Sequence, residues 1–232
     1  MQESKGLFSK RNLIFMGVFV VLGLIALQIN VNHLAGSKAS LTLFEMIGPL
    51  ATAFIGTIPG VIAVAIMEIV NFLIHGAKTL DAGTIIHFFP MLVGAWYFGA
   101  KGKFNWIIPV IAIAAFLLNP IGRSAWEYSL YWLIPIVAYF FREKSLIIRT
   151  LGATFASHAV GGAVWVWVFG LTKAIWIGLI PVVAIERSMF AIGMAVSYLL
   201  VNNILNVLVN KKIVPFSGLV NKQYVWKWAD NL

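Results

Sequence analysis

Apolar residues fill this chain in about eight closely spaced segments, and short polar gaps separate them. An α-helix needs about 20 predominantly apolar residues to cross the hydrocarbon core of a bilayer, which is about 30 Å thick. Most of the segments approach that length, and the gaps between them are too short to fold on their own. The pattern therefore predicts helices over residues 12–27, 84–98, 104–119, 125–141 and 145–169.

Two further apolar stretches are too long for a single crossing. The stretch over 41–75 contains a Gly/Pro motif at 56–60, and we expect a turn there because Pro lacks a backbone donor and Gly frees the dihedral angles. Its halves form either two thin helices or a re-entrant hairpin. The stretch over 174–205 would be about 48 Å long as one helix. We expect Pro181 to divide it into a short interfacial piece and a crossing over 182–205.

These segments predict an all-α polytopic membrane protein. We expect a bundle of six to eight transmembrane helices, with segments broken by Pro and Gly, in one domain over 12–205. Tails lie at 1–11 and 206–232, and the mixed aromatic and basic residues of the second tail are typical of a membrane surface. The first segment follows a basic tail, as in a signal peptide, but no small-residue cleavage site ends it. We therefore expect a retained helix.

Positive charge favours every second gap between the segments. These gaps and the two tails hold 12 of the 17 basic residues, namely Lys5, Lys10, Arg11, Lys101, Lys103, Arg142, Lys144, Arg149, Lys211, Lys212, Lys222 and Lys227. Short loops rich in Lys and Arg stay on the cytoplasmic side of a membrane. We therefore expect both termini in the cytoplasm, an even number of crossings and a multi-pass protein of the cell membrane.

Composition supports the membrane class and argues against others. The hydrophobic fraction is 61% and only 11% of residues are charged, whereas a soluble domain has about 25%. The net charge of +9 lies in short loops and forms no continuous patch. We therefore expect contact with anionic membrane lipid or an acidic cytoplasmic partner, and no nucleic acid. The chain has no Cys, which excludes disulfides and thiolate metal sites.

Enzyme signatures are absent from the sequence. It contains no His-Glu-x-x-His motif, no Gly-x-Ser-x-Gly motif and no Walker phosphate loop. We therefore expect no nucleotide hydrolysis by this chain, no cofactor and no catalytic residue. A metal site built from the membrane-associated His residues with Glu68 or Glu186 stays open, but no spacing supports it, and none is predicted.

Ionisable residues within the apolar segments gather in the half predicted to face the outside. Such groups are costly in a bilayer, so they face the bundle interior or water. By the predicted topology the outer half holds Glu45, Glu127, Glu186 and Arg187, and the middle holds Glu68 and His158. A cavity open to the outside is the simplest arrangement that hydrates these groups.

The sharpest local pattern lies in the segment that ends at Phe169. His158, Gly161, Gly162 and Trp165 share one helical face, at positions i, i+3, i+4 and i+7. A His and a Trp with small residues between them make a wall for a planar ligand, on which Trp165 would stack. The alternative is that the two Gly residues allow close helix packing and that His158 bonds a neighbouring helix.

Charged residues complete the set of ligand-binding candidates. Glu186 and Arg187 are adjacent, so their side chains point about 100° apart. One of them can bind ligand while the other pairs with Glu127 or Glu68. We expect Arg187, together with the imidazole, to hydrogen-bond or neutralise an anionic group. We expect Glu45, Glu68 and Glu127 to accept donors or hold the guanidinium, and a purely structural ion pair is the alternative.

Three stretches in the first 105 residues carry a family resemblance. They read Leu41-Thr-Leu-Phe-Glu-Met-Ile-Gly-Pro-Leu, Phe54-Ile-Gly-Thr-Ile-Pro-Gly-Val-Ile-Ala and Met67-Glu-Ile-Val-Asn-Phe-Leu, and a basic loop follows at Gly99–Lys103. This text resembles the substrate-binding (S) components of energy-coupling-factor (ECF) transporters. The resemblance implies a small membrane protein that captures a vitamin, metal or related micronutrient from outside. It also implies a transmembrane coupling subunit and two cytoplasmic ATPases as partners.

Three functions are compatible with these residues. The first is a solute-uptake component that binds a small-molecule substrate in an outward cavity. The second is an intramembrane enzyme for a lipid-like substrate, with His158 and either Glu68 or Glu186 as acid and base. The third is a membrane scaffold subunit whose buried polar groups only fix helix packing.

Overall fold

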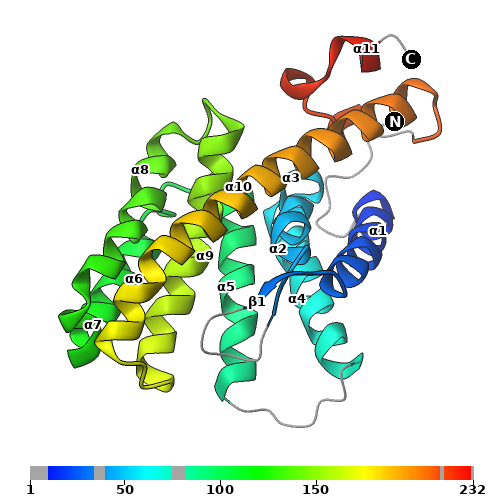
Figure 1. Cartoon of the computed structure of the whole chain (residues 1–232). Helices are drawn as coiled ribbons and strands as arrows, with labels where there is room; N and C mark the ends of the chain where they lie inside the picture. Colours follow the sequence, from blue (N-terminus) through cyan, green and yellow to red (C-terminus); the bar gives the residue numbers. More distant parts are fainter. Residues whose placement is uncertain (1–9, 34–39, 75–81, 215–216, 231–232) are drawn as a thin grey trace.

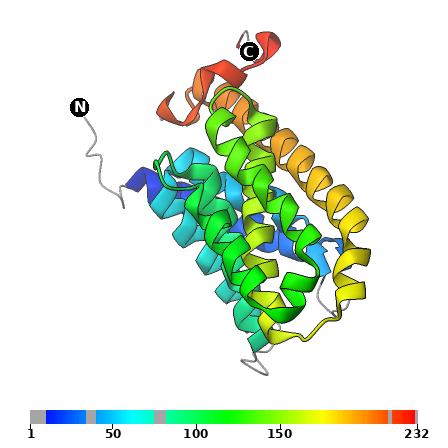
Figure 2. The same cartoon turned by 90° about the vertical axis from the view of Figure 1, so that its left-hand side faces the viewer.

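The structure, a computed structural model, is a bundle whose successive long helices run in alternate directions (Figures 1 and 2). It describes residues 10–33, 40–74, 82–214 and 217–230. In chain order its elements are α1 (Lys10–Leu27), β1 (Asn30–His33), β2 (Ser40–Thr42), α2 (Phe44–Ile47), η1 (Gly48–Leu50), α3 (Ala51–Ile55), α4 (Thr57–Ile74), α5 (Ala82–Gly99), α6 (Ile107–Leu118), α7 (Pro120–Ser124), η2 (Trp126–Trp132), α8 (Leu133–Phe141), α9 (Leu146–Val168), α10 (Lys173–Asn210), η3 (Ser217–Leu219), η4 (Lys222–Tyr224) and α11 (Lys227–Asp230). The predicted helical bundle is confirmed.

The apolar segments became helices close to their predicted ranges. The helices α1, α5, α6 and α9 begin and end within three residues of the expected positions. Within the described residues, α4, α9 and α10 are long and apolar enough to cross a membrane. Shorter apolar helices occupy 12–27, 44–55, 88–99 and 107–118. These lengths and compositions fit a helical membrane protein.

Large apolar side chains cover the outer surface of the bundle. Ile25 on α1, Ile69 on α4, Ile111 on α6 and Ile185 on α10 are each more than half exposed. Water would penalise so many exposed aliphatic groups on one protein, whereas lipid tails would not. The outer surface is therefore compatible with surrounding hydrocarbon.

The break predicted at 56–60 lies at Gly56. This residue has φ +97°, a left-handed conformation that favours Gly, and it separates α3 from α4. Pro59 does not end a helix, because it lies in the first turn of α4, where the backbone N–H has no intrahelical partner. Gly60 packs against the backbone of Thr52, where an added Cβ would come within 2.5 Å of the Thr52 nitrogen. The turn folds α3 tightly against α4.

A short sheet departs from the all-α expectation. Strands β1 and β2 pair in antiparallel fashion after α1, with Asn30 opposite Thr42. Strand β1 lies in the polar gap between the predicted segments at 12–27 and 41–75. Strand pairing satisfies backbone N–H and C=O groups of β1 and β2 before the chain enters α2.

The helix predicted over 125–141 is wrong in its first half. Asn119 caps α7 by accepting hydrogen bonds from the backbone of Ile121 and Gly122, and Pro120 occupies the first helical position. The chain then forms the 3-10 helix η2 over 126–132 before α8 begins. The apolar pattern did not distinguish these elements because all of them are buried on one side.

The division predicted at Pro181 is also wrong. The helix α10 continues through this residue over 38 residues and ends at Asn210, five residues beyond the predicted boundary. Pro removes a single helical hydrogen bond, and the helix is anchored on both sides of it, because Trp176 and Val183 are both buried in the same core cluster. At 1.5 Å per residue α10 is about 57 Å long, and it runs obliquely along the whole bundle (Figures 1 and 2).

The helix α9 lies at the centre of the bundle and packs against α5, α6, α8 and α10. Two Gly residues of α9 permit the close approach of neighbouring elements. An added Cβ on Gly152 would lie 2.5 Å from the ring of Tyr97 on α5, and one on Gly162 would lie 2.6 Å from the ring of Trp132. Gly162 therefore allows close packing, as the alternative interpretation of its helical face predicted, and large aromatic rings fill the space beside both Gly residues.

Candidate functional site

A cavity of about 140 Å³ lies inside the bundle, between α5, η2, α9 and α10. One water needs about 10–15 Å³ on this measure, so the cavity has room for a small organic molecule or roughly ten waters. The lining residues are Glu45, Pro90, Met91, Tyr128, Ser157, His158, Gly161, Gly162, Trp165, Leu171, Trp176, Leu179, Val182, Val183, Glu186 and Arg187.

The cavity brings together five of the seven residues proposed from the sequence. They come from three elements, with Glu45 on α2, His158 and Trp165 on α9, and Glu186 and Arg187 on α10. The helical face predicted for α9 is the face that lines the cavity, since both Gly residues of that pattern also contribute. Tertiary packing therefore places residues that are far apart in the sequence around one space.

The other two proposed residues lie outside the lining. Glu127 is on η2, and its Oε2 is buried without a hydrogen-bond partner in the part of the chain described. Glu68 is on α4, near enough to Glu45 for the two carboxyl groups to interact electrostatically. The expected pairing of Arg187 with Glu127 or Glu68 is not present among the described residues, because its ion pairs there are with Glu45 and Glu186.

His158 is held between two aromatic side chains of η2. The indole Nε1 of Trp132 donates to His158 Nδ1 over 3.1 Å, and the hydroxyl oxygen of Tyr128 lies 2.9 Å from Nε2. An indole N–H can only donate, so Nδ1 is the accepting, unprotonated nitrogen. The proton of the neutral imidazole is therefore on Nε2 and is donated to Tyr128.

This arrangement matches the alternative predicted for His158, in which the imidazole bonds a neighbouring helix. Both ring nitrogens are engaged by protein side chains, so neither is available to bind an anionic group or to act as an acid or base. A positively charged imidazole would place two N–H groups, those of Trp132 and of Nδ1, against each other. His158 is a positioning residue that fixes the orientation of the Tyr128 hydroxyl.

The Tyr128 hydroxyl has one proton to offer. Its oxygen accepts from His158, and the described residues provide no acceptor for its own O–H. The side chain is only 3% exposed and lines the cavity. A ligand in the cavity with an oxygen or nitrogen lone pair would complete this hydrogen bond.

Arg187 lies between two carboxylates. Its Nη1 is 3.7 Å from Glu45 and its Nη2 is 3.7 Å from Glu186. The guanidinium also lies over the ring of Phe190, with 5.0 Å from Cζ to the centroid. Arg187 and Glu186 are almost fully buried, whereas the Glu45 side chain is about one-fifth exposed. The positive charge that Arg187 brings to the lining is thus already balanced within the protein.

Aromatic residues of the wall were missed by the sequence analysis. Tyr128 and Trp176 line the cavity, and their rings meet edge to face with centroids 4.7 Å apart. Trp165, which was predicted, stacks on Phe169 with centroids 4.1 Å apart. The aromatic-rich sequence over 126–132 could have indicated an aromatic wall that includes Tyr128, but the apolar pattern predicted a regular helix there.

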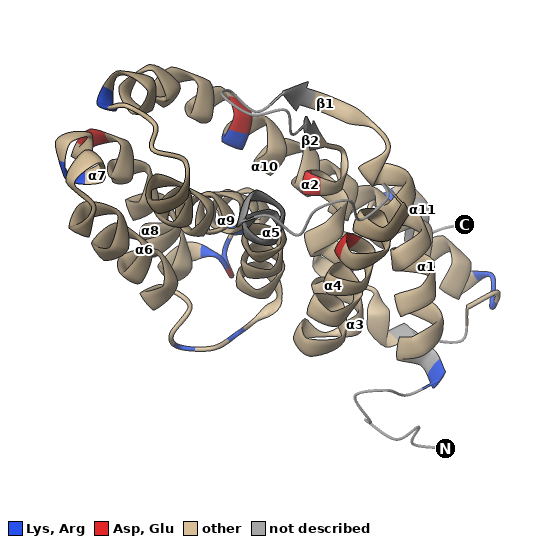
Figure 3. Ribbon diagram, turned by 90° about the horizontal axis from the view of Figure 1, so that it is seen from below, with Lys and Arg blue, Asp and Glu red and all other residues tan. Residues whose placement is uncertain are grey.

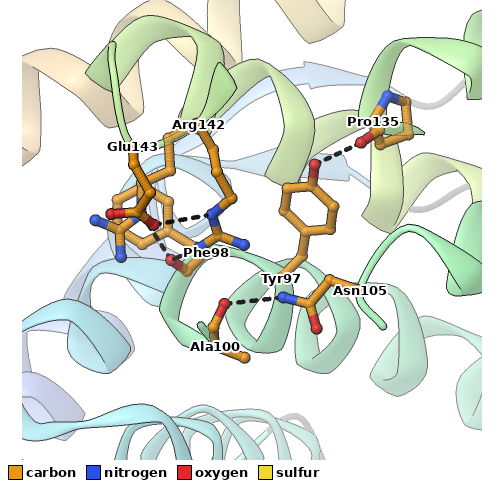
Figure 4. A network of polar contacts seen from close by, with 8 residues as sticks. Tyr97, Phe98, Ala100, Asn105, Pro135, Arg142 and Glu143 are labelled. Atoms are coloured by element: carbon orange, nitrogen blue, oxygen red, sulfur yellow. Dashed lines mark hydrogen bonds and ion pairs between the residues drawn. The ribbon is translucent and has the colours of Figure 1, made fainter. Parts of the chain in front are cut away.

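A second polar cluster lies at the other end of the bundle (Figure 4). Arg142 and Arg149 both donate to the carbonyl oxygen of Phe98, over 2.9 and 2.8 Å, in the last turn of α5. Positive groups stabilise the carbonyl end of a helix. Tyr97 donates to the carbonyl of Pro135 on α8, which ties α5 to the next helices. These basic residues therefore have a structural role besides their position in a positively charged loop.

The asparagines of α10 also have structural partners. Asn202 exchanges hydrogen bonds with the backbone of Asn221, and Asn203 bonds the backbone of Tyr224 and Trp226. They hold the C-terminal segment, including η4, along the end of α10.

No protein-family model, no curated protein and no solved structure matches this chain. Its function must therefore be inferred from the cavity and from the chemistry of the lining residues.

Proposed function

We propose that this protein is a multi-pass membrane protein that captures a small solute in the cavity between α5, η2, α9 and α10. In this role it is the substrate-binding component of an uptake transporter for a vitamin-like micronutrient. The observation that supports the proposal most strongly is the cavity itself, which lies in a lipid-compatible bundle and gathers five residues proposed independently from the sequence.

The position of the cavity along the bundle supports capture from outside. The lining residues of α9 come from the half that leads to the α9–α10 connection, which itself contributes Leu171, and those of α5 lie at the middle of that helix. The basic loops at 100–106 and 142–145 lie at the opposite end (Figure 1). If those loops are cytoplasmic, with six to eight crossings and both termini inside, the cavity opens toward the exterior.

The energy for uptake would come from other chains. The sequence has no phosphate loop, and its resemblance to ECF substrate-binding components implies a transmembrane coupling subunit and two cytoplasmic ATPases. The apolar outer faces of the helices would provide contact area for such a subunit within the membrane.

The proposal is tested by ligand-dependent thermal stability. A ligand that binds only the folded state stabilises it by about 2.7 kcal/mol when the free ligand concentration is 100 times the Kd. We therefore expect a panel of vitamins to contain a compound that raises the Tm of the purified protein by several degrees. Trp165→Ala should abolish that increase. Trp167→Ala is the matched control, because Trp167 is on the same helix, is 56% exposed and does not line the cavity.

Two results would contradict the proposal. One is a full panel in which no compound raises the Tm. The other is a stabilising compound whose effect survives Trp165→Ala unchanged, since this would place the binding site elsewhere.

A further inference from the structure

We infer that Arg142 and Arg149 form a binding site for the phosphate group of an anionic phospholipid. The site lies at the end of the bundle that carries the basic loops, and it is independent of solute capture in the cavity. Three features support it: the unbalanced charge of the two guanidinium groups, the unused donors of Arg149, and the exposed aromatic residues of the same loops.

The two guanidinium groups carry more positive charge than their surroundings balance. Arg142 and Arg149 both donate to the carbonyl oxygen of Phe98, which brings them together on one acceptor. A guanidinium keeps its full charge in proteins, whereas a carbonyl at a helix end carries only a partial negative charge. Among the described residues, the one carboxylate within ion-pair distance of either group is that of Glu143, 3.5 Å from Arg142 Nε. Two cations beside one anion leave one positive charge.

Burial makes this excess charge costly. Arg142 is only 4% exposed, and its Nη1 is buried without a hydrogen-bond partner in the part of the chain described. Glu143 is 65% exposed, so water screens its attraction for the two cations. It is also the only acidic residue at 100–106 and 142–149, and Figure 3 shows the basic positions of both loops. A bound anion would balance the remaining charge.

Arg149 offers the donors for such an anion. Its Nε is engaged by Phe98, but no described residue accepts a hydrogen bond from its Nη1 or Nη2. The side chain is only partly buried, and neither of these nitrogens is an enclosed unpaired atom. The guanidinium lies over the Phe98 ring, with 4.3 Å from Cζ to the centroid, which holds its plane. A planar guanidinium with two unused nitrogens matches the oxygens of a phosphate group.

Exposed aromatic residues favour a lipid over a free ion. Phe104, Phe140 and Phe141 lie in or beside the two basic loops, and all three are exposed. Lys144 lies over the Phe141 ring, with 5.5 Å from Nζ to the centroid. Basic and aromatic side chains are mixed in this way at the level of lipid headgroups, where acyl chains cover the rings and phosphates meet the cations. This end is also the one predicted to face the cytoplasm, where the membrane leaflet carries anionic lipid.

Competition binding to the purified protein in detergent tests the inference. The probe is a fluorescent phosphatidylglycerol, and the competitors are unlabelled phosphatidylglycerol, phosphatidylcholine, inorganic phosphate and a hexaglutamate peptide. Arg149→Gln removes one charge of the pair. Lys103→Gln is the matched control, because Lys103 is exposed in the neighbouring basic loop and removes the same charge from the same end.

We expect phosphatidylglycerol to compete about tenfold better than phosphatidylcholine. Arg149→Gln should lower the affinity for the probe by about tenfold, as for a lost charge-assisted hydrogen bond, and Lys103→Gln by about twofold or less. Glu143→Gln should raise the affinity by about twofold to fivefold, because it removes the only nearby anion. Glu143 is exposed and both Arg residues stay in place, so this variant decides the matter if Arg149→Gln does not fold.

Several results would overturn the lipid site. One is equal competition by phosphatidylglycerol and phosphatidylcholine. Equal losses of affinity in Arg149→Gln and Lys103→Gln would show a diffuse surface charge, and a Glu143→Gln variant with unchanged affinity would show that the pair does not meet the phosphate. Inorganic phosphate or hexaglutamate competing as well as phosphatidylglycerol would replace the lipid by a free anion or by an acidic protein segment. None of these results affects solute binding in the cavity.

Discussion

Trp132 determines the direction of the hydrogen bonds between His158 and Tyr128. Its indole can only donate, so it decides which nitrogen of His158 carries the proton. That choice determines the direction of the hydrogen bond to Tyr128 and leaves the Tyr128 proton for a ligand. The sequence predicted His158 as a site residue from its helical face, but not this role, because the deciding donor is 26 residues away.

Tyr128→Phe tests this chain of hydrogen bonds. The substitution leaves the buried Nε2–H of His158 without an acceptor, and we expect the free energy of unfolding to fall by about 1–3 kcal/mol. Affinity for a ligand found in the vitamin panel should also fall, by about tenfold for a lost hydrogen bond worth 1.4 kcal/mol. Reversible denaturation in detergent and titration of the ligand measure the two effects.

Tyr131→Phe is the matched control for Tyr128→Phe. Tyr131 donates to the carbonyl oxygen of Ile180 over 3.0 Å and does not line the cavity. Its loss should lower stability by about 1 kcal/mol or less, because the carbonyl is already within a helix. Equal losses of stability and affinity in the two variants would contradict the proposed direction of the hydrogen bond.

At the scale of elements, the cavity exists because η2 is packed against one face of α9. Gly162 permits the contact, since any side chain there would meet the Trp132 ring. The 3-10 helix carries both Tyr128 and Trp132, and α10 closes the opposite side with Trp176 and Val183. The sequence predicted α9 almost to the residue, whereas η2 and the continuity of α10 depend on contacts between elements.

Gly162→Ala tests the contact between α9 and η2. A Cβ there would lie 2.6 Å from the Trp132 ring, which is fully buried and has no space to move into. We expect the thermal midpoint to fall by several degrees, as overpacking costs about 1–3 kcal/mol. Binding of the panel ligand should weaken as well, because Trp132 orients His158.

Gly178→Ala is the control for this prediction. Gly178 lies in α10 with no atom near the position of an added Cβ. The substitution should leave the midpoint unchanged or raise it, since Ala favours a helix over Gly by about 1 kcal/mol. A neutral Gly162→Ala would show that the Trp132 ring is not confined as the structure has it.

At the scale of the whole molecule, alternating helix directions place the basic loops at 100–106 and 142–145 at one end of the bundle and the α9–α10 connection at the other (Figure 1). The cavity includes Leu171 of that connection. The charge pattern of the sequence assigns the basic end to the cytoplasm. Under this predicted topology, the aromatic-walled cavity would lie toward the outside and the basic loops toward the inside. The sidedness of the bundle is therefore the assumption on which solute capture depends.

Labelling of single Cys variants in intact cells tests the sidedness. Lys103→Cys lies in the basic loop and Ser124→Cys lies at the end of α7, and both positions are exposed. With a membrane-impermeant maleimide we expect Ser124→Cys to react at once and Lys103→Cys to react only after permeabilisation. The reverse pattern would invert the topology and direct the cavity to the cytoplasm.

The sequence by itself determined the helical class, the main helix ranges and the face of α9 that meets the cavity. The length and periodicity of an apolar segment are local properties of the sequence, and they favour a helix whatever the segment later packs against. It also determined that His158, Glu186 and Arg187 are buried polar residues that need an explanation.

Only the tertiary structure decided what these residues do. The ion pairs of Arg187 with Glu45 and Glu186, the tautomer of His158 and the continuity of α10 through Pro181 all depend on contacts between elements. Hydrogen-bond direction and charge balance arise from distances of about 3–4 Å between side chains. No local pattern along a chain fixes such distances, because they exist only once the helices have packed.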